Sequence, residues 1–219
     1  MNYIYVIDKP KGWTSNDVVQ KIKHHFAYRK VGHGGTLDPN ATGVLVIGYN
    51  EGTKLLTQFI TNDKEYEAQI QFGIQTDTFD ITGKIINRKL FNHISKQSIE
   101  TALKYFQNNE YWQTPPMFSA KKVNGQKLYQ LARNNKSINI KPQLVKLINF
   151  QIMGFNHGVL KLTLTVSKGF YIRSLANDLG AKLQSCATLI ELKRTKSGQF
   201  HIIDSITMDQ LLKDKKRYE

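Results

Sequence analysis

One stretch organises this chain: Gly32-His33-Gly34-Gly35-Thr36-Leu37-Asp38-Pro39-Asn40-Ala41-Thr42-Gly43, followed by Val44-Leu45-Val46-Ile47-Gly48. Its first part combines four glycines with one histidine and one carboxylate. Glycine lets a backbone turn sharply and approach a ligand closely. Pro39 stiffens the chain and favours an extended conformation at Asp38. This composition is typical of an active-site loop that holds the Asp38 carboxylate in place, ahead of a buried strand.

Two other interpretations apply to a glycine-rich loop. A phosphate-binding P-loop ends in Gly-Lys-Ser/Thr, whereas this loop ends in Ala-Thr-Gly-Val, so we exclude a P-loop. An ordinary turn, in which the Asp38 side chain bonds to its own backbone, explains the composition equally well. From this stretch alone, the active-site loop and the simple turn both stay open.

The composition favours a soluble protein with a polyanionic partner. The chain has 219 residues, and its 31 Lys and Arg exceed its 17 Asp and Glu, which gives a net charge of +14. Charge alone does not separate RNA, DNA and an anionic membrane. No apolar run approaches the roughly 20 residues of a membrane helix, and Asp8-Lys9 follows the N-terminus too closely for a signal peptide. We therefore expect a cytoplasmic protein that does not contact a membrane.

Hydrophobic spacing predicts a mixture of strands and helices. The expected strands cover residues 3–7, 44–48, 64–72, 144–150, 159–166 and 187–195. The expected helices begin at a cap on Thr14 or Ser15, then cover 51–60, 95–106, 128–133, a segment after Arg173 and 208–212. In the helix over 51–60 we expect Leu55, Leu56 and Phe59 to face inward. The lone Cys186 excludes an intrachain disulfide and is expected to be a small buried residue.

Two polar segments carry functional hypotheses. Residues 121 to 146 are polar and basic around an Asn124-Gly125 hairpin signal, which predicts a projecting insertion. A run of charges is usually a solvated loop, but the cations of this segment can also bind phosphates. These cations are Lys121, Lys122, Lys127, Arg133, Lys136 and Lys141. The turn Thr76-Asp77-Thr78-Phe79-Asp80-Ile81-Thr82-Gly83 offers two carboxylates but lacks the further ligands of a calcium loop, so we expect no metal there.

Several short motifs occur in a fixed order: Lys9-Pro10-x-Gly12-x-Thr14-Ser15, the loop through Gly43, Lys64-x-Tyr66, Thr76-Asp-Thr-x-Asp80, Pro115-Pro-Met-x-Ser-Ala120, Lys168-Gly-x-Tyr171-Ile-Arg173-Ser-Leu175 and Leu192-x-Arg194-Thr195. In order and spacing this set strongly resembles the TruB family of tRNA pseudouridine synthases, from Asp8 to about Phe200. The ordered set is far more specific than any single motif.

The resemblance implies an enzyme that isomerises uridine to pseudouridine, at position 55 in the T arm of tRNA. It implies no cofactor, no metal and a monomer. The family's catalytic aspartate falls on Asp38, its stacking tyrosine on Tyr66 and its active-site arginine on Arg173. Its other substrate-contacting positions fall on His33, Tyr171 and Leu192.

We therefore expect one catalytic domain over residues 1–219 with a pseudouridine-synthase-like α+β fold. Its core would be a mixed, mainly antiparallel sheet flanked by helices, with a basic RNA-binding insertion at about 121–146. Many family members carry a C-terminal RNA-binding PUA domain, and we expect this chain to lack one. RNA binding would then depend on the catalytic domain and the insertion.

The implied chemistry agrees with these residue types. Pseudouridine formation breaks the N1 to C1′ bond, turns the uracil and rejoins it through C5. Asp38 can attack C1′, stabilise an oxocarbenium-like sugar or abstract a proton on the way to a glycal, and the sequence leaves the route open. Arg173 would keep Asp38 ionised, because a nearby opposite charge lowers the pKa of a carboxyl. Tyr66 offers a face for the uracil, or is simply a core tyrosine.

The target uridine must leave its stack before Asp38 can reach it, and His33 is suited to fill the space left behind. Four residues depart from the family pattern: Asn40, Phe118, Phe170 and Thr188, where Leu, Tyr, Thr and His are usual. None of these is a proposed catalytic group. The main alternative function is a non-catalytic RNA-binding or tRNA-folding factor on the same scaffold, but the joint presence of Asp38, Tyr66 and Arg173 favours the enzyme.

Overall fold

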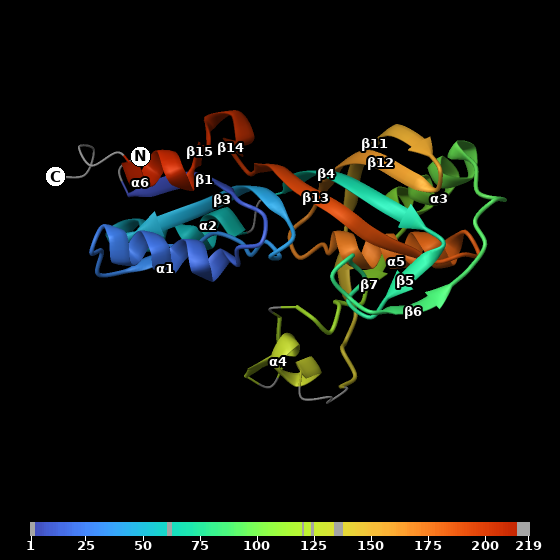
Figure 1. The fold of residues 1–219 in the computed structure, drawn as a ribbon, viewed down its shortest axis with the longest axis horizontal. Coiled ribbons are helices and arrows are strands. Elements are labelled where there is room, and N and C mark those ends of the chain that lie inside the picture. The colour runs from blue at the N-terminus through green and yellow to red at the C-terminus, as the bar shows by residue number, and fades with distance from the viewer. Residues whose placement is uncertain (1–2, 61–62, 120, 124, 134–137, 214–219) are drawn as a thin grey trace. The chain divides into compact units, whose positions relative to one another are not determined.

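The computed structural model describes residues 3–60, 63–119, 121–123, 125–133 and 138–213 (Figure 1). The chain forms two compact units. The first contains Met1–Tyr66 and Leu192–Glu219, and the second contains Glu67–Glu191. Strands β4 (Lys64–Phe72) and β13 (Ala187–Ser197) each begin in one unit and end in the other.

The first unit is built around the strand that follows the glycine loop. This strand, β3 (Thr42–Tyr49), lies between β1 (Ile4–Lys9) and β13, antiparallel to the former and parallel to the latter. Residues 44–47 of β3 have no exposed surface, which confirms the predicted buried strand. Two short strands extend the sheet: β2 (Val31–His33) pairs with β3, and β15 (Ile206–Thr207) pairs with β1.

Two helices of this unit match their predictions. Helix α1 (Ser15–His25) starts at Thr14, which forms a reciprocal capping box with Asp17. Its inward residues Val18, Val19 and Ile22 are buried. The terminal helix α6 (Met208–Lys213) also matches its prediction, and the short strand β14 (Phe200–His201) and 3₁₀-helix η2 (Ile202–Asp204) precede it.

The single helix expected over residues 51–60 is wrong. The segment divides into a 3₁₀-helix, η1 (Asn50–Lys54), and a short α-helix, α2 (Leu56–Ile60). Leu56 and Phe59 pack on Val44 and Val46 of β3, but Leu55 is 37% exposed. A 3₁₀-helix has three residues per turn, so the change of helix type at Leu55 removes this residue from the inward face.

The second unit contains the predicted antiparallel pair. Strands β11 (Leu147–Asn156) and β12 (Val159–Val166) are neighbours, and the order continues through β4 to β13. Helix α3 (Lys96–Asn108) buries the four predicted residues: Ile99, Ala102, Leu103 and Phe106. It contacts β11 and helix α5 (Ile172–Lys182). The observed architecture is thus an α+β fold with a mainly antiparallel sheet, as expected.

Some short elements of this unit differ from the prediction. The strand expected over 144–150 is broken at Lys146, and its first part is β10 (Gln143–Val145), which pairs with β7 (Tyr111–Gln113). A further hairpin joins β5 (Ile74–Thr76) to β6 (Ile85–Arg88). All of β6 is exposed, so its sequence lacks the alternation that identifies a half-buried strand.

The predicted insertion hairpin is present. Strand β8 (Lys122–Val123) pairs with β9 (Gln126–Lys127), and helix α4 (Leu128–Arg133) follows. Asn124 itself lies outside the described residues. Figure 1 shows α4 away from α3, α5, β11 and β12 of the second unit, as expected for a projecting insertion. Cys186 is a buried free thiol, and no helix among the described residues is long and apolar enough to cross a membrane.

Candidate active site

The loop that carries Asp38 is fixed by main-chain bonds on both sides of this residue. Before it, the Ser15 hydroxyl accepts from Leu37 N at 2.9 Å and donates to Leu37 O at 3.0 Å. After it, Gly12 N donates to Pro39 O at 2.8 Å, and a turn closes from Ala41 N to Asp38 O at 3.1 Å. The half-buried Asp38 is therefore held by contacts to the Lys9–Ser15 motif as well as by its own loop.

A buried lysine lies under this loop. The Lys9 side chain has no exposed surface, and its ammonium group donates to Trp13 O at 2.7 Å, Pro10 O at 2.8 Å and Pro39 O at 3.3 Å. Burial lowers the pKa of Lys9 to about 8, although the nearby Asp38 carboxylate acts in the opposite direction. Lys9 thus joins the first motif to the Asp38 loop, a role that the sequence did not reveal.

A buried arginine holds the same loop from another side. Arg194, 1% exposed on β13, donates from Nε to Val44 O at 2.7 Å, from Nη2 to Gly35 O at 3.1 Å and from Nη1 to Thr36 O at 3.4 Å. Removing a guanidinium from water is costly unless its donors are satisfied. Arg194 meets this condition with carbonyls at both ends of the loop, and so helps to fix the path of the backbone.

The other predicted site residues of the first unit lie on its strands. His33 is half-buried on β2, Tyr66 is 9% exposed on β4, and Leu192 is half-buried on β13. The start of β4 is held by a 3.2 Å ion pair between Lys196 and Glu65. Four of the six predicted residues, including Asp38, therefore belong to this unit.

Tyr171 and Arg173 belong to the second unit, at the start of α5. Arg173 is 4% exposed and donates from Nη2 to Phe118 O at 3.0 Å and from Nη1 to Thr78 O at 3.1 Å. Its Nη1 also lies 3.6 Å from Asp80 Oδ2. The predicted strand-to-helix junction is confirmed, and the arginine is held there by a carboxylate and two carbonyls.

The acidic turn before β6 therefore serves Arg173. Asp80 is buried, and its Oδ1 accepts bonds from Thr78 Oγ1 and Thr82 N, each at 2.9 Å. Over the part of the chain that the structure describes, no group of three or more His, Cys, Asp or Glu is arranged to hold a metal ion. The sequence suggested the two carboxylates of this turn but not that Asp80 pairs with Arg173, which lies far away in the chain.

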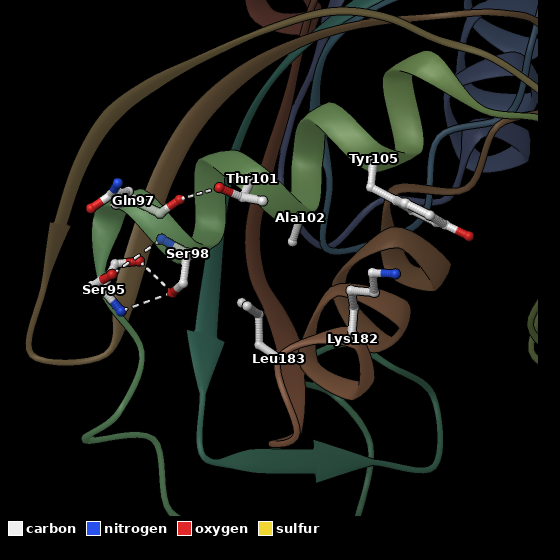
Figure 2. A pocket seen from close by; sticks show the side chains of 8 residues that line it. All are labelled: Ser95, Gln97, Ser98, Thr101, Ala102, Tyr105, Lys182 and Leu183. Carbon is white, nitrogen blue, oxygen red and sulfur yellow. Dashed lines mark hydrogen bonds between the residues drawn. The ribbon is translucent and has the colours of Figure 1, made fainter.

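A separate pocket of about 630 Å³ lies between α3 and the C-terminal end of α5 (Figure 2). Figure 2 shows Lys182 and Leu183 opposite Ala102 and Tyr105, and the Lys182 ammonium lies 3.4 Å from the centre of the Tyr105 ring. Lys182 is nine residues from Arg173, or about 13 Å along the helix axis. The pocket contains none of the predicted site residues.

Two family models together match most of the chain. The model described as "TruB family pseudouridylate synthase (N terminal domain)" matches residues 23–172, and the one described as "tRNA pseudouridylate synthase B C-terminal domain" matches residues 173–219. The chain belongs to the TruB family. The resemblance found in its motifs is thereby confirmed.

Curated relatives agree with this assignment, and a solved structure has a similar fold. The chain is 54% identical over 210 residues to a tRNA pseudouridine synthase B of Ureaplasma urealyticum, covering 95% of this chain and 91% of the relative. It is 43% identical to the protein of that name from Francisella philomiragia, covering 96% and 70%. A structure of a Cbf5-Nop10-Gar1 complex matches with a TM-score of 0.76 at 26% identity, covering 96% of this chain and 54% of that chain.

Proposed function

We propose that this protein isomerises uridine to pseudouridine in tRNA. The observation that carries the proposal is the family assignment over nearly the whole chain, together with relatives up to 54% identical that are named tRNA pseudouridine synthase B. The arrangement of the Asp38 loop supports it, because an aspartate held by fixed backbone contacts suits chemistry at a sugar or base.

We further infer that the target is uridine 55 of the T arm, and that a monomer acts in the cytoplasm without a cofactor. These finer points rest on the motifs shared with the family. The net charge of +14 supports an RNA partner, because neutralising phosphates with Lys and Arg releases counterions.

We assign the chemical step to Asp38, which acts on the sugar or the base while the glycosidic bond breaks and re-forms through C5. Tyr66 provides the stacking surface for the flipped uracil, and His33, Tyr171 and Leu192 contact the substrate. Arg173 keeps Asp38 ionised during the reaction. This role rests on the motif shared with the family, and the contacts of Arg173 to Asp80 and two carbonyls add that its guanidinium has a fixed orientation within its own unit.

The test is to map pseudouridine at nucleotide resolution in tRNA incubated with pure protein. Wild type is expected to modify one uridine in the T arm. Asp38→Asn is expected to form no pseudouridine while its Kd for tRNA stays within about threefold of wild type, because the amide preserves shape but not charge. Asp209→Asn, at an exposed position of α6, is the matched control and should retain full activity.

The alternative function is a non-catalytic tRNA-folding factor. It makes the opposite prediction for the wild-type protein, which would bind tRNA and change its structure without forming pseudouridine at any position. In that case Asp38→Asn and Asp209→Asn would behave alike in every assay.

A further inference from the structure

We propose that Gln113 is a positioning residue that fixes Tyr171 and Arg173 at the start of α5. This inference rests on the proposed function, because it concerns how two of its site residues are held. Gln113 lies on β7, in none of the motifs that identify the family, and its side chain has no exposed surface.

The Gln113 side-chain amide forms hydrogen bonds with both main-chain groups of Tyr171. Its Oε1 accepts a bond from Tyr171 N at 2.7 Å, and its Nε2 donates to Tyr171 O at 3.0 Å. Nε2 also donates to the hydroxyl of Tyr111 at 3.3 Å. Because one rigid amide bonds to both main-chain groups of one residue, Tyr171 cannot rotate or shift without losing both bonds.

The bonds from Gln113 hold the N-terminus of α5 at a position where the helix lacks a capping side chain. Tyr171 is the N-cap of α5, and its side chain makes no capping bond. Ser, Thr, Asp or Asn normally occupies this position, because their oxygens accept from the first helical N–H groups. A tyrosine there departs from the local preference, as residues at functional sites often do. Gln113 supplies from a neighbouring strand part of the order that a capping side chain would give.

A second contact holds α5 further along its axis. The Tyr111 hydroxyl donates to Asp178 Oδ2 at 2.6 Å. Tyr111 and Gln113 are two positions apart on β7 and so point to the same side, while Trp112 between them is 59% exposed. Residues 171 and 178 are two helical turns apart on one face of α5. Attachment at two points prevents the helix from sliding or turning against β7.

The chain that leaves β7 continues to bond the first turn of α5. Thr114 O accepts from Ser174 Oγ at 2.8 Å, and Phe118 O accepts from Arg173 Nη2 at 3.0 Å. Gln113 therefore begins a segment whose carbonyls also orient the proposed catalytic arginine. A shift of Tyr171 relative to β7 would move Arg173 with it, because the two residues are joined by a single helical residue.

An apolar residue at position 113 would also fill this buried space, but it would not fix the backbone of Tyr171. A buried amide is costly unless its bonds are made, and a fully satisfied one specifies a single arrangement. Displacing reacting groups by about 1 Å can lower a rate about 100-fold. We therefore expect Gln113 to affect the rate of the reaction more than the binding of tRNA.

The test compares Gln113→Leu and Gln113→Glu with wild type in pseudouridine formation and tRNA binding. Gln113→Leu is expected to lower kcat about 100-fold while KM and the Kd for tRNA change less than about threefold. Gln107→Leu is the matched control. It removes a half-buried amide that donates from α3 to Ile148 O at 2.9 Å, and it should leave kcat unchanged.

Gln113→Glu gives a readout that a purely structural role would not produce. A protonated carboxyl at this position can accept from Tyr171 N and donate to Tyr171 O, whereas the ionised form cannot donate. The groups facing it are the Tyr111 hydroxyl and, through it, the Asp178 carboxyl. The variant is therefore expected to lose kcat as pH rises, with a titration that wild type lacks.

The proposal is overturned if Gln113→Leu keeps kcat within about threefold of wild type. It is overturned equally if kcat and tRNA affinity fall together and Gln113→Glu has the wild-type pH profile. If Gln113→Leu does not fold, the nearly isosteric Gln113→Glu decides by its pH profile, and unfolding of both variants refutes the positioning role. Inactive wild-type protein would refute the proposed function instead, since every variant is compared with it.

Discussion

Lys9 is buried beside the Asp38 loop, and its ammonium group donates to three carbonyls. Asp38 and Arg194 are the nearby charges with the largest effects on it, and they act in opposite directions. Its ordinary pKa of 10.5 is lowered to about 8 in the folded protein, chiefly because burial disfavours the ammonium ion. Between these two values the unfolded chain binds more protons at this site than the folded chain. The contribution of Lys9 to stability therefore rises with pH, and is smallest below pH 8.

Replacing Lys9 by Met tests whether the contribution of Lys9 to stability rises with pH. We expect the stability of wild type relative to Lys9→Met to increase by at most about 3 kcal/mol between pH 7 and pH 10.5, since each pKa unit corresponds to about 1.4 kcal/mol. Urea unfolding of both proteins across this range measures it, and Lys11→Met, at an exposed lysine nearby, is the control. A difference that stays constant with pH would contradict the depressed pKa.

The residues proposed from the sequence stand in local motifs, whereas the residues that it missed act through partners distant in the chain. Asp38 and Arg173 stand in dense motifs, so the sequence is enough to propose them for the chemical step. Gln113 and Lys9 act through partners 58 and 30 positions away, and periodicity reports only on local neighbours. The metal considered for the acidic turn illustrates the same limit, because the cation that Asp80 meets is Arg173 from another part of the chain.

Among the elements, β3 and β13 approach each other closely near the Asp38 loop. Gly43, the second residue of β3, is aligned with Arg194 of β13 in the parallel pair. Its φ of +98° lies in a region that side chains rarely adopt, and a Cβ there would overlap the Arg194 carbonyl oxygen and crowd Arg194 N at 2.8 Å. The two strands can meet here only because this residue is glycine.

Gly43→Ala is therefore expected to cost more than about 3 kcal/mol of stability, the sum of backbone strain and steric overlap. Gly12→Ala is the matched control. Its φ is +87°, but no atom lies within 4 Å of the new Cβ, so the cost should be only about 1 to 2 kcal/mol of strain. Thermal or urea unfolding measures both, and equal losses would show that the overlap with Arg194 is relieved easily.

Elements were predictable where one face is buried along the whole element. The stripe of α3 and the alternation of β12 are examples, since every residue expected inside is buried. Where burial does not follow a single period, one helix was predicted wrongly and one strand was missed. Segment 51–60 changes from a 3₁₀-helix to an α-helix at Leu55, and β6 is exposed along its length. Neither feature leaves a periodic pattern of apolar residues in the sequence.

For the whole molecule, fold class and family follow from the order of motifs, because that order extends over nearly all of the chain. The charge is also a whole-molecule property, with 31 basic against 17 acidic side chains. A positive field of this size favours binding of any polyanion, and so contributes affinity rather than sequence preference. Recognition of one uridine must then come from the site residues and from the shape of the RNA.

If charge supplies affinity and the site residues supply recognition, salt should weaken tRNA binding without changing the chemical step. The affinity for tRNA should weaken about 10³-fold or more between 50 and 200 mM salt if about six or more phosphates are contacted, while kcat at saturating tRNA stays nearly constant.

Lys141→Ala, at an exposed position of the basic insertion, should lower the slope of log Kd against log salt by about one. Lys96→Ala, at an exposed position of α3, is the control and should not change the slope. Equal slopes for wild type and both variants would mean that Lys141 makes no phosphate contact, and a flat salt response of wild type would exclude phosphate contacts as the source of affinity.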